Sequence, residues 1–314
     1  MSAGGERMRG RWADALRAFI AERRACGYAY GRSHVCACER LCSFLGERDM
    51  DEAAFAEWVA PRDGEACRTR ANRVGLWNVF AGFCVRRDIE AGSLRADVRL
   101  ESDFVPHIYT DEEASAVFSA ADAGIAQRRS PYEPSLIMPA FVRLLYSTGL
   151  RFSEAAGLRW DDVDGRRLSV LGKGGKPRLV VMSASMAEVL ERYRGLRVGG
   201  GGLVFCGREG GPLQNQLVGT WHRTLLDSAG VRRADGAYPR LHDWRHTFAV
   251  GALARMDAAG VDVRAALPVL SRYMGHCGPK ETEWYLRLTD EGRAGVLERM
   301  ELYAPHVAPG LGGV

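Results

Sequence analysis

Helical periodicity dominates this sequence, and a single β-hairpin pattern interrupts it. Residues 167–171 and 178–182 alternate or run apolar, and the Gly-rich turn 172–177 separates them. Two such runs joined by a glycine-containing loop are typical of an antiparallel hairpin. On both sides of it, apolar residues recur at the spacing of one helix face. The predicted fold class is therefore mainly α with a small β-hairpin or sheet.

The helical pattern defines candidate elements along most of the chain. In the N-terminal third it covers 12–20, 34–45 and 68–87, with a turn at 61–64. Helical sequence continues to Leu150, and helices resume after the hairpin over 184–196, 217–229, 243–255, 265–274 and about 290–302.

The length of 314 residues predicts two domains, at about 100–200 residues each. A boundary is expected near 100–109, because this stretch lacks a helical period and Pro106 favours extended backbone before it. Thr110 and Glu113 then form a capping-box pattern that begins a new helix. We predict a helical domain over 1–105, a mixed α/β domain over 106–290 and a tail over 291–314.

Composition excludes several classes of protein. With 46% hydrophobic and 26% charged residues, the chain is neither disordered nor fibrous. No apolar run reaches the ~18 residues of a membrane span, and residues 1–11 lack a secretory signal. The eight cysteines are too few for a disulfide scaffold. We therefore expect a cytoplasmic protein that has no membrane partner.

Charge is informative through its distribution rather than its total. The net charge of +4, from 43 basic and 39 acidic residues, neither requires nor excludes nucleic acid. Only three residues are lysines, and Lys173 lies in the Gly-rich turn. Since a lysine can give up a proton when its pKa is lowered, Lys173 is a candidate proton donor. A solvated hairpin tip is an equally good interpretation of Lys173 alone.

The segment 148–154 carries a candidate anion-binding arginine. Gly149 closes one helix, Arg151 begins the next, and Glu154 follows three residues later, where it can brace the guanidinium. A guanidinium binds phosphate oxygens bidentately. Taken alone, this segment is better explained as a surface Arg–Glu pair.

Two further segments carry histidines. His242 and Arg245 are expected to share one helix face, with Trp244, Phe248 and Gly251 on the opposite, buried side. His276 is followed nine residues later by Tyr285. Alone, His276 could be a helix cap and Tyr285 an interface aromatic.

Together these segments resemble the tyrosine recombinase (phage integrase) family over about 107–290. The matching motifs are Gly-Leu-Arg-Phe-Ser-Glu, Gly-Lys-Gly-Gly-Lys-Pro-Arg, His-Asp-Trp-Arg-His-Thr-Phe-Ala, and Gly-His followed at nine residues by Tyr-Leu. The N-terminal third matches only in outline, since Ser93-Leu94 follows Gly92 where the family often has Asn-Pro. The resemblance implies a two-domain DNA clamp, with a core-binding domain over 1–105 and a catalytic domain over 106–290.

The resemblance also implies a role for each residue. Tyr285 would attack a DNA phosphate, giving a 3′-phosphotyrosyl link and a free 5′-hydroxyl. Arg151, Arg245 and His276 would stabilise the developing charge. Lys173 would protonate the leaving oxygen, and His242 would assist proton movement at the nucleophile. Glu154 would orient Arg151. Neither ATP nor a metal cofactor is implied.

Other candidates are weaker. His34, Cys38 and Cys42 fall at i, i+4 and i+8, but they lack the paired spacing of structural zinc, so we expect no metal site. Basic and amide side chains that begin a helix could contact the DNA backbone, although a solvated helix face explains them nearly as well: Arg68, Arg70, Asn72 and Arg73. Tyr273 and Tyr303 are rival nucleophiles, which the spacing disfavours.

The expected partners are double-stranded DNA with paired half-sites and further copies of the chain, as a dimer or tetramer on DNA. The implied function is site-specific recombination for integration or excision of a mobile element. A relaxing enzyme resembling type IB topoisomerases and a non-catalytic DNA-binding protein are the alternatives. The tail 291–314 contains a short amphipathic pattern that either docks on its own domain or connects subunits.

Overall fold

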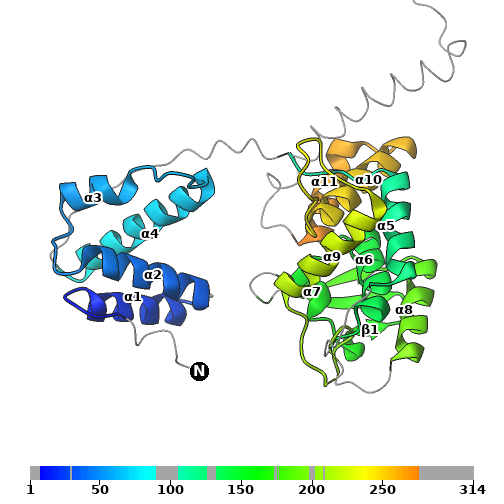
Figure 1. Ribbon diagram of the computed structural model, residues 1–314, viewed down its shortest axis with the longest axis horizontal. Helices are drawn as coiled ribbons and strands as arrows, with labels where there is room; N and C mark the ends of the chain where they lie inside the picture. The colour runs from blue at the N-terminus through cyan, green and yellow to red at the C-terminus, as the bar shows by residue number, and fades with distance from the viewer. Residues whose placement is uncertain are drawn as a thin grey trace, which may run out of the picture. The chain divides into compact units, whose positions relative to one another are not determined.

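The computed structural model describes residues 8–28, 30–89, 105–125, 132–172, 175, 177–197, 202–207 and 209–275. The chain divides into two compact units, Met1–Phe104 and Val105–Val314. The predicted fold class is confirmed: the described residues are mostly helical, with one three-stranded sheet (Figure 1). No helix among them is long and apolar enough to cross a membrane.

The N-terminal unit contains four described helices: α1 (Ala13–Ala25), α2 (Arg32–Leu45), α3 (Glu52–Val59) and α4 (Cys67–Arg86). The sequence pattern missed α3, an eight-residue helix that begins when Asp51 accepts a hydrogen bond from the Ala54 amide at 2.8 Å. Aromatic side chains fill the core, where Phe19 contacts Phe80 and Phe83 edge to face at 5.6 and 5.5 Å between ring centroids.

The second unit begins with the predicted capping box. Thr110 Oγ1 accepts from the Glu113 amide, and the Glu113 carboxylate accepts from the Thr110 amide. The helices that follow are α5 (Asp111–Ala123), α6 (Pro134–Thr148), α7 (Phe152–Ala156), α8 (Ala184–Leu196), α9 (Asn215–Ala229), α10 (Asp243–Ala258) and α11 (Val263–Met274). A short 3₁₀ turn, η1 (Trp160–Asp162), leads into the sheet.

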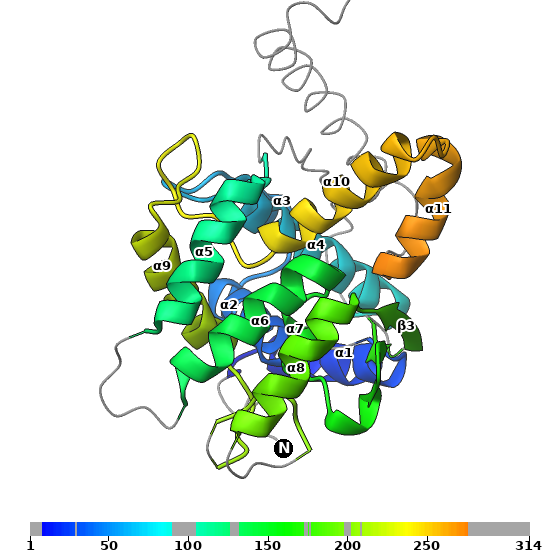
Figure 2. The same cartoon turned by 90° about the vertical axis from the view of Figure 1, so that its right-hand side faces the viewer.

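The predicted hairpin is present as β2 (Arg167–Leu171) and β3 (Pro177–Val181), which pair antiparallel with Ser169 opposite Leu179. A two-residue strand, β1 (Val163–Asp164), adds to β2, so the sheet order is β1-β2-β3. Leu168, Val170 and Val180 alternate onto the buried face. β3 contacts α11, which brings the hairpin to the helix that precedes His276 in sequence (Figure 2).

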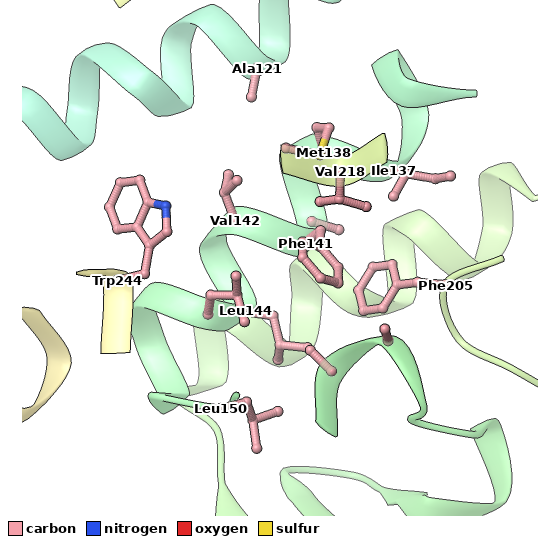
Figure 3. Packing of buried hydrophobic residues seen from close by; sticks show 14 of the residues in the cluster. Ala121, Ile137, Met138, Phe141, Val142, Leu144, Leu150, Phe205, Val218 and Trp244 are labelled. Atoms are coloured by element: carbon pink, nitrogen blue, oxygen red, sulfur yellow. The ribbon is translucent and has the colours of Figure 1, made fainter. Parts of the chain in front are cut away.

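Helix α6 lies at the centre of the core of this unit and contacts α5, α8 and α10. Phe141 and Leu144 of α6, Phe205 from the loop before α9 and Trp244 of α10 belong to one buried cluster (Figure 3). Each is completely or almost completely buried. Because interiors are close-packed, this cluster fixes where the C-terminus of α6 and the N-terminus of α10 lie.

Candidate active site

Gly149 ends α6 and so determines where Arg151 is placed. Its φ of +64° is a left-handed conformation that favours glycine, and a Cβ at this position would lie 2.4 Å from Phe248. The chain therefore turns sharply after Thr148, and Arg151 becomes the N-cap residue of α7 with extended backbone. The sequence prediction for the two helix ends is met.

Glu154 is a buried carboxylate with two arginine partners. It accepts from the Arg151 amide at 2.9 Å and from Arg151 Nη1 at 3.0 Å. Its side chain is only 4% exposed, so this is not the surface pair that the segment suggests when taken alone. Burial raises the pKa of Glu154, but hydrogen bonds from Arg178 and Arg151 outweigh it, and the net shift is downward. Glu154 is therefore ionised at neutral pH.

Arg178 on β3 is the second partner, and the sequence motifs alone do not indicate a role for it. Its Nη1 and Nη2 donate to the two oxygens of Glu154 at 2.9 and 2.7 Å. The sequence does contain an indication that Arg178 is buried, because strand alternation places it on the same face as the buried Val180. A charged residue on the core face of a strand requires a buried counter-ion.

Helix α10 carries the second pair of predicted residues. His242 is its N-cap, and Arg245 lies in the first turn. The expected burial pattern is partly wrong: Trp244 is buried, but so is Arg245, at 1% exposure, whereas Phe248 and Gly251 are only partly covered. The reason is that α10 packs against both α6 and α11, so two of its faces are covered.

The guanidinium groups converge on the C-terminus of α11. Arg245 donates to the carbonyl oxygens of Gly149 at 2.7 Å and Met274 at 2.5 Å. Arg151 Nη2 donates to the Gly275 carbonyl at 3.0 Å. Residues from 29 to 124 positions apart in sequence are thereby joined at one place. His276 is the next residue in sequence after Gly275.

His242 belongs to the same electrostatic site. Burial, then the positive charges of Arg245 and Arg151, lower the pKa of His242 to about 4, although part of the residue remains exposed. The imidazole is therefore neutral at neutral pH and has a lone pair that can take a proton.

An aromatic and histidine cluster supports the first turn of α10 from behind. Trp244 stacks on Tyr109, with ring centroids 3.8 Å apart and planes 1° from parallel. Trp244 Nε1 donates to His222 Nε2 at 3.0 Å. Complete burial lowers the pKa of His222 to about 3. His222 accepts this bond as a neutral ring, which keeps Trp244 in place beside Arg245.

Three predicted site residues, Lys173, His276 and Tyr285, lie outside the described residues, as does the tail 291–314. The rival Tyr273 is described. Its hydroxyl donates to the Val181 carbonyl at 3.4 Å, its ring stacks on Phe248, and burial raises its pKa. Tyr273 is thus engaged in packing α11 against β3.

The candidate DNA contacts of the N-terminal unit fall into two groups. Arg68 and Asn72 are exposed on α4. Arg70 Nε instead donates to the Val59 carbonyl at 2.9 Å, and Arg73 forms a bidentate pair with Glu65 at 3.0 and 2.6 Å. The guanidinium of Arg73 is therefore committed to its own unit.

Within the described part of the chain, no group of three or more His, Cys, Asp or Glu side chains is arranged to hold a metal ion. Cys38, one of the residues considered for zinc, is buried in the N-terminal core. Burial raises the pKa of the Cys38 thiol to about 12. A thiol in that state is a packing group rather than a thiolate ligand.

Comparison with known proteins agrees with this geometry. The phage integrase family matches residues 111–291, more than half of the chain, which includes every element that builds the site. The chain therefore belongs to the phage integrase family. The tyrosine recombinase resemblance of its motifs is confirmed, and the class of protein is that of the site-specific recombinases.

Two curated relatives illustrate the match. Tyrosine recombinase XerC of Rhizobium meliloti is 34% identical over 263 residues, which cover 80% of this chain and 76% of that protein. A putative integrase/recombinase of Sinorhizobium fredii, y4rB, is 35% identical over 210 residues, 62% of this chain and 66% of that protein. The chain thus spans slightly less than two thirds of y4rB.

Solved structures share the fold. The Tn1549 transposon integrase in complex with a circular intermediate DNA has a TM-score of 0.64 at 18% identity, over 86% of this chain and 94% of that one. The XerH site-specific recombinase bound to its difH substrate has a TM-score of 0.61 at 18% identity, over 89% and 83%.

Proposed function

We propose that this chain cuts and rejoins DNA at specific sites through a covalent 3′-phosphotyrosyl intermediate formed by Tyr285. The observation that carries the proposal is the convergence of Arg151 and Arg245 at the end of α11, with the neutral His242 close enough for both positive charges to lower its pKa. The family membership supports it. A mobile element is the proposed substrate, in line with the transposon integrase among the structural neighbours.

The residues divide the chemistry between charge and protons. The Tyr285 hydroxyl oxygen bonds to phosphorus while the bond from phosphorus to the 5′-oxygen breaks. His242 takes the hydroxyl proton, and Lys173 gives a proton to the departing 5′-oxygen. Arg151, Arg245 and His276 stabilise the extra negative charge on the non-bridging oxygens. The phosphodiester energy is kept in the tyrosyl ester, so rejoining reverses these steps without ATP.

The arrangement of Arg151 suits this role. Its amide and Nη1 are bonded to Glu154, and Nη2 bonds the Gly275 carbonyl, so the planar group is oriented before DNA arrives. Its side chain is 23% exposed, which leaves an edge for a phosphate oxygen. Donors that are fixed in advance cost little reorganisation in the transition state.

We further propose that paired DNA half-sites and additional copies of the chain are its partners. Several structural neighbours were solved on DNA, and the lambda integrase neighbour is a dimer bound to a core site. In the N-terminal unit, the exposed Arg68 and Asn72 are the better candidates for contact with the DNA backbone. The tail 291–314 is the proposed connector between subunits.

A nicked suicide substrate tests the nucleophile. The DNA is nicked near the cleavage position so that the freed 5′-hydroxyl fragment diffuses away and the covalent complex accumulates. Tyr285→Phe should abolish the SDS-stable adduct while DNA affinity stays nearly intact, because the change removes one hydroxyl. Tyr273→Phe is the matched control and should keep the adduct. An adduct formed by Tyr285→Phe would overturn the assignment.

A further inference from the structure

Three consecutive carbonyl groups at the C-terminus of α11 each accept a hydrogen bond from a different arginine. The donors are Arg178 Nε to Tyr273 at 2.8 Å, Arg245 Nη2 to Met274 at 2.5 Å, and Arg151 Nη2 to Gly275 at 3.0 Å. A helix C-terminus has unpaired carbonyls and a partial negative charge. The three guanidinium groups donate hydrogen bonds to these carbonyls, and their positive charges offset the partial negative charge. Together they fix the end of this helix.

Arg178 differs from the other two arginines because both of its terminal nitrogens bond Glu154, whereas Arg151 bonds that carboxylate through Nη1 and its own backbone amide. All three of its nitrogens are engaged: Nη1 and Nη2 bond the carboxylate, and Nε bonds the carbonyl of Tyr273. Its side chain is only 11% exposed. Three of the five N–H donors of Arg178 are therefore used within the protein, and little of its side chain is accessible to a phosphate.

The contacts of Arg178 join three elements that carry the proposed site. It lies on β3, five residues after Lys173 in sequence. Through Glu154 it reaches Arg151 at the start of α7, and through Tyr273 it reaches the end of α11, just before His276 in sequence. The packing at this junction is tight, because a Cβ at Gly275 would lie 3.0 Å from Arg178 Nη1.

We propose that Arg178 is a positioning residue for strand cleavage: it holds Glu154, and through it Arg151, in the orientation that binds the scissile phosphate, and it fixes the end of α11 in the same step. This inference rests on the proposed function. A bidentate Arg–carboxylate pair sets the plane of both groups, which a lysine at this position could not do.

Two variants separate positioning from charge. Arg178→Gln removes the positive charge, whereas Arg178→Lys keeps the positive charge beside Glu154 but cannot form the bidentate pair. Both should form the covalent adduct on a nicked substrate roughly 100-fold more slowly, the cost of misplacing a reacting group by about 1 Å. Binding of a single half-site should stay nearly unchanged. Arg143→Gln is the matched control, since it breaks a bidentate pair of similar geometry with Asp122 and should cleave normally.

A substrate with a methylphosphonate at the scissile position tests positioning directly. If Arg178 had only a structural role, its variants would lose the same factor in cleavage rate on this substrate as on normal DNA. The methyl group replaces one charged non-bridging oxygen, so less charge remains for Arg151 to stabilise. If Arg178 acts through Arg151, the loss in the Arg178 variants should shrink to about tenfold or less on this substrate. The Arg151→Ala variant should show the same shift.

The outcomes distinguish this inference from the proposed function. Wild-type cleavage rates in both Arg178 variants would overturn the positioning role and leave Tyr285 as the nucleophile. An equal loss on both substrates would also overturn it, since the defect would not pass through Arg151. An adduct that persists in Tyr285→Phe would instead overturn the proposed function.

Discussion

Each unit of the chain has a well-covered arginine–glutamate pair, and the two pairs differ in what else they contact. In the N-terminal unit, Arg73 forms a bidentate bond with Glu65, and both side chains are less than 10% exposed. Arg73 also donates to the Ala60 carbonyl and lies over the Trp58 ring. The pair joins the start of α4 to the turn before it. Each charge has its partner there.

In the second unit one carboxylate serves two guanidiniums. Glu154 bonds both Arg178 and Arg151, so these three side chains carry a net charge of +1. Arg151 also stays more exposed than Arg73, at 23% against 9%. The comparison shows that a buried ion pair in which the two charges balance indicates a structural role. An excess of fixed positive charge with an accessible edge indicates a site for an anion.

Removal of the arginine from each pair gives the largest contrast. Arg151→Ala should slow adduct formation by roughly 100- to 1,000-fold, the usual cost of losing one preorganised donor to the transition-state charge. Arg73→Ala should lower the midpoint of denaturant unfolding, with little change in the adduct rate per folded molecule. Suicide-substrate kinetics and urea titrations of both variants check this. A comparable loss of rate in Arg73→Ala would break the distinction.

Two glycines with positive φ provide a second comparison between the two units. Gly64 lies in the N-terminal unit with φ +69° and open space around it, whereas Gly149 has φ +64° and Phe248 against it. Gly64→Ala should cost about 1 kcal/mol for the backbone conformation alone. Gly149→Ala should cost about 2 kcal/mol or more, because Phe248 must also move. Urea midpoints at constant m-value measure both, and Gly149→Ala alone should slow cleavage, since Arg151 lies two residues on.

Acid should weaken the second unit through His222. Its pKa is about 3 in the folded protein and near 6.5 when exposed, so the unfolded state binds more protons between these values. The stability that neutral His222 contributes is fully present above pH 6.5. It is lost as the pH falls from 6.5 toward 3, at about 1.4 kcal/mol per pH unit. His222→Gln, which can still accept from Trp244, should flatten the pH dependence of the urea midpoint. An unchanged slope would contradict this.

The helices and the hairpin could be predicted because their signals are local. The Thr110 capping box, the alternation in β2 and the apolar stripe of α4 are each contained within one element, and their bounds agree within a few residues. Helix α3 was missed because eight residues offer little more than two turns of periodicity. Its Asp51 cap was the remaining signal.

The site could be predicted only in part, because its contacts are not local. The motif order indicated Arg151, Glu154, His242 and Arg245, but the burial of Arg245 depends on α11 covering a second face of α10. Arg178 and Glu154 are 24 residues apart, and their pairing arises from the way β3 meets α7. Arg70 and Arg73 are the opposite case. They belong to a basic cluster in sequence that suggests DNA contacts, but their guanidinium groups bond Val59 and Glu65 within the N-terminal unit.

Mapping the DNA-linked residue tests the central claim most directly. The wild-type covalent complex is digested with nuclease and trypsin, and the peptides are analysed by mass spectrometry. Cleavage after Lys280 and Arg287 releases residues 281–287, which contain Tyr285, whereas Tyr273 falls in the separate peptide 273–280. We predict a nucleotide remnant on Tyr285 in peptide 281–287. A remnant on Tyr273 or on any other residue would contradict the proposed mechanism.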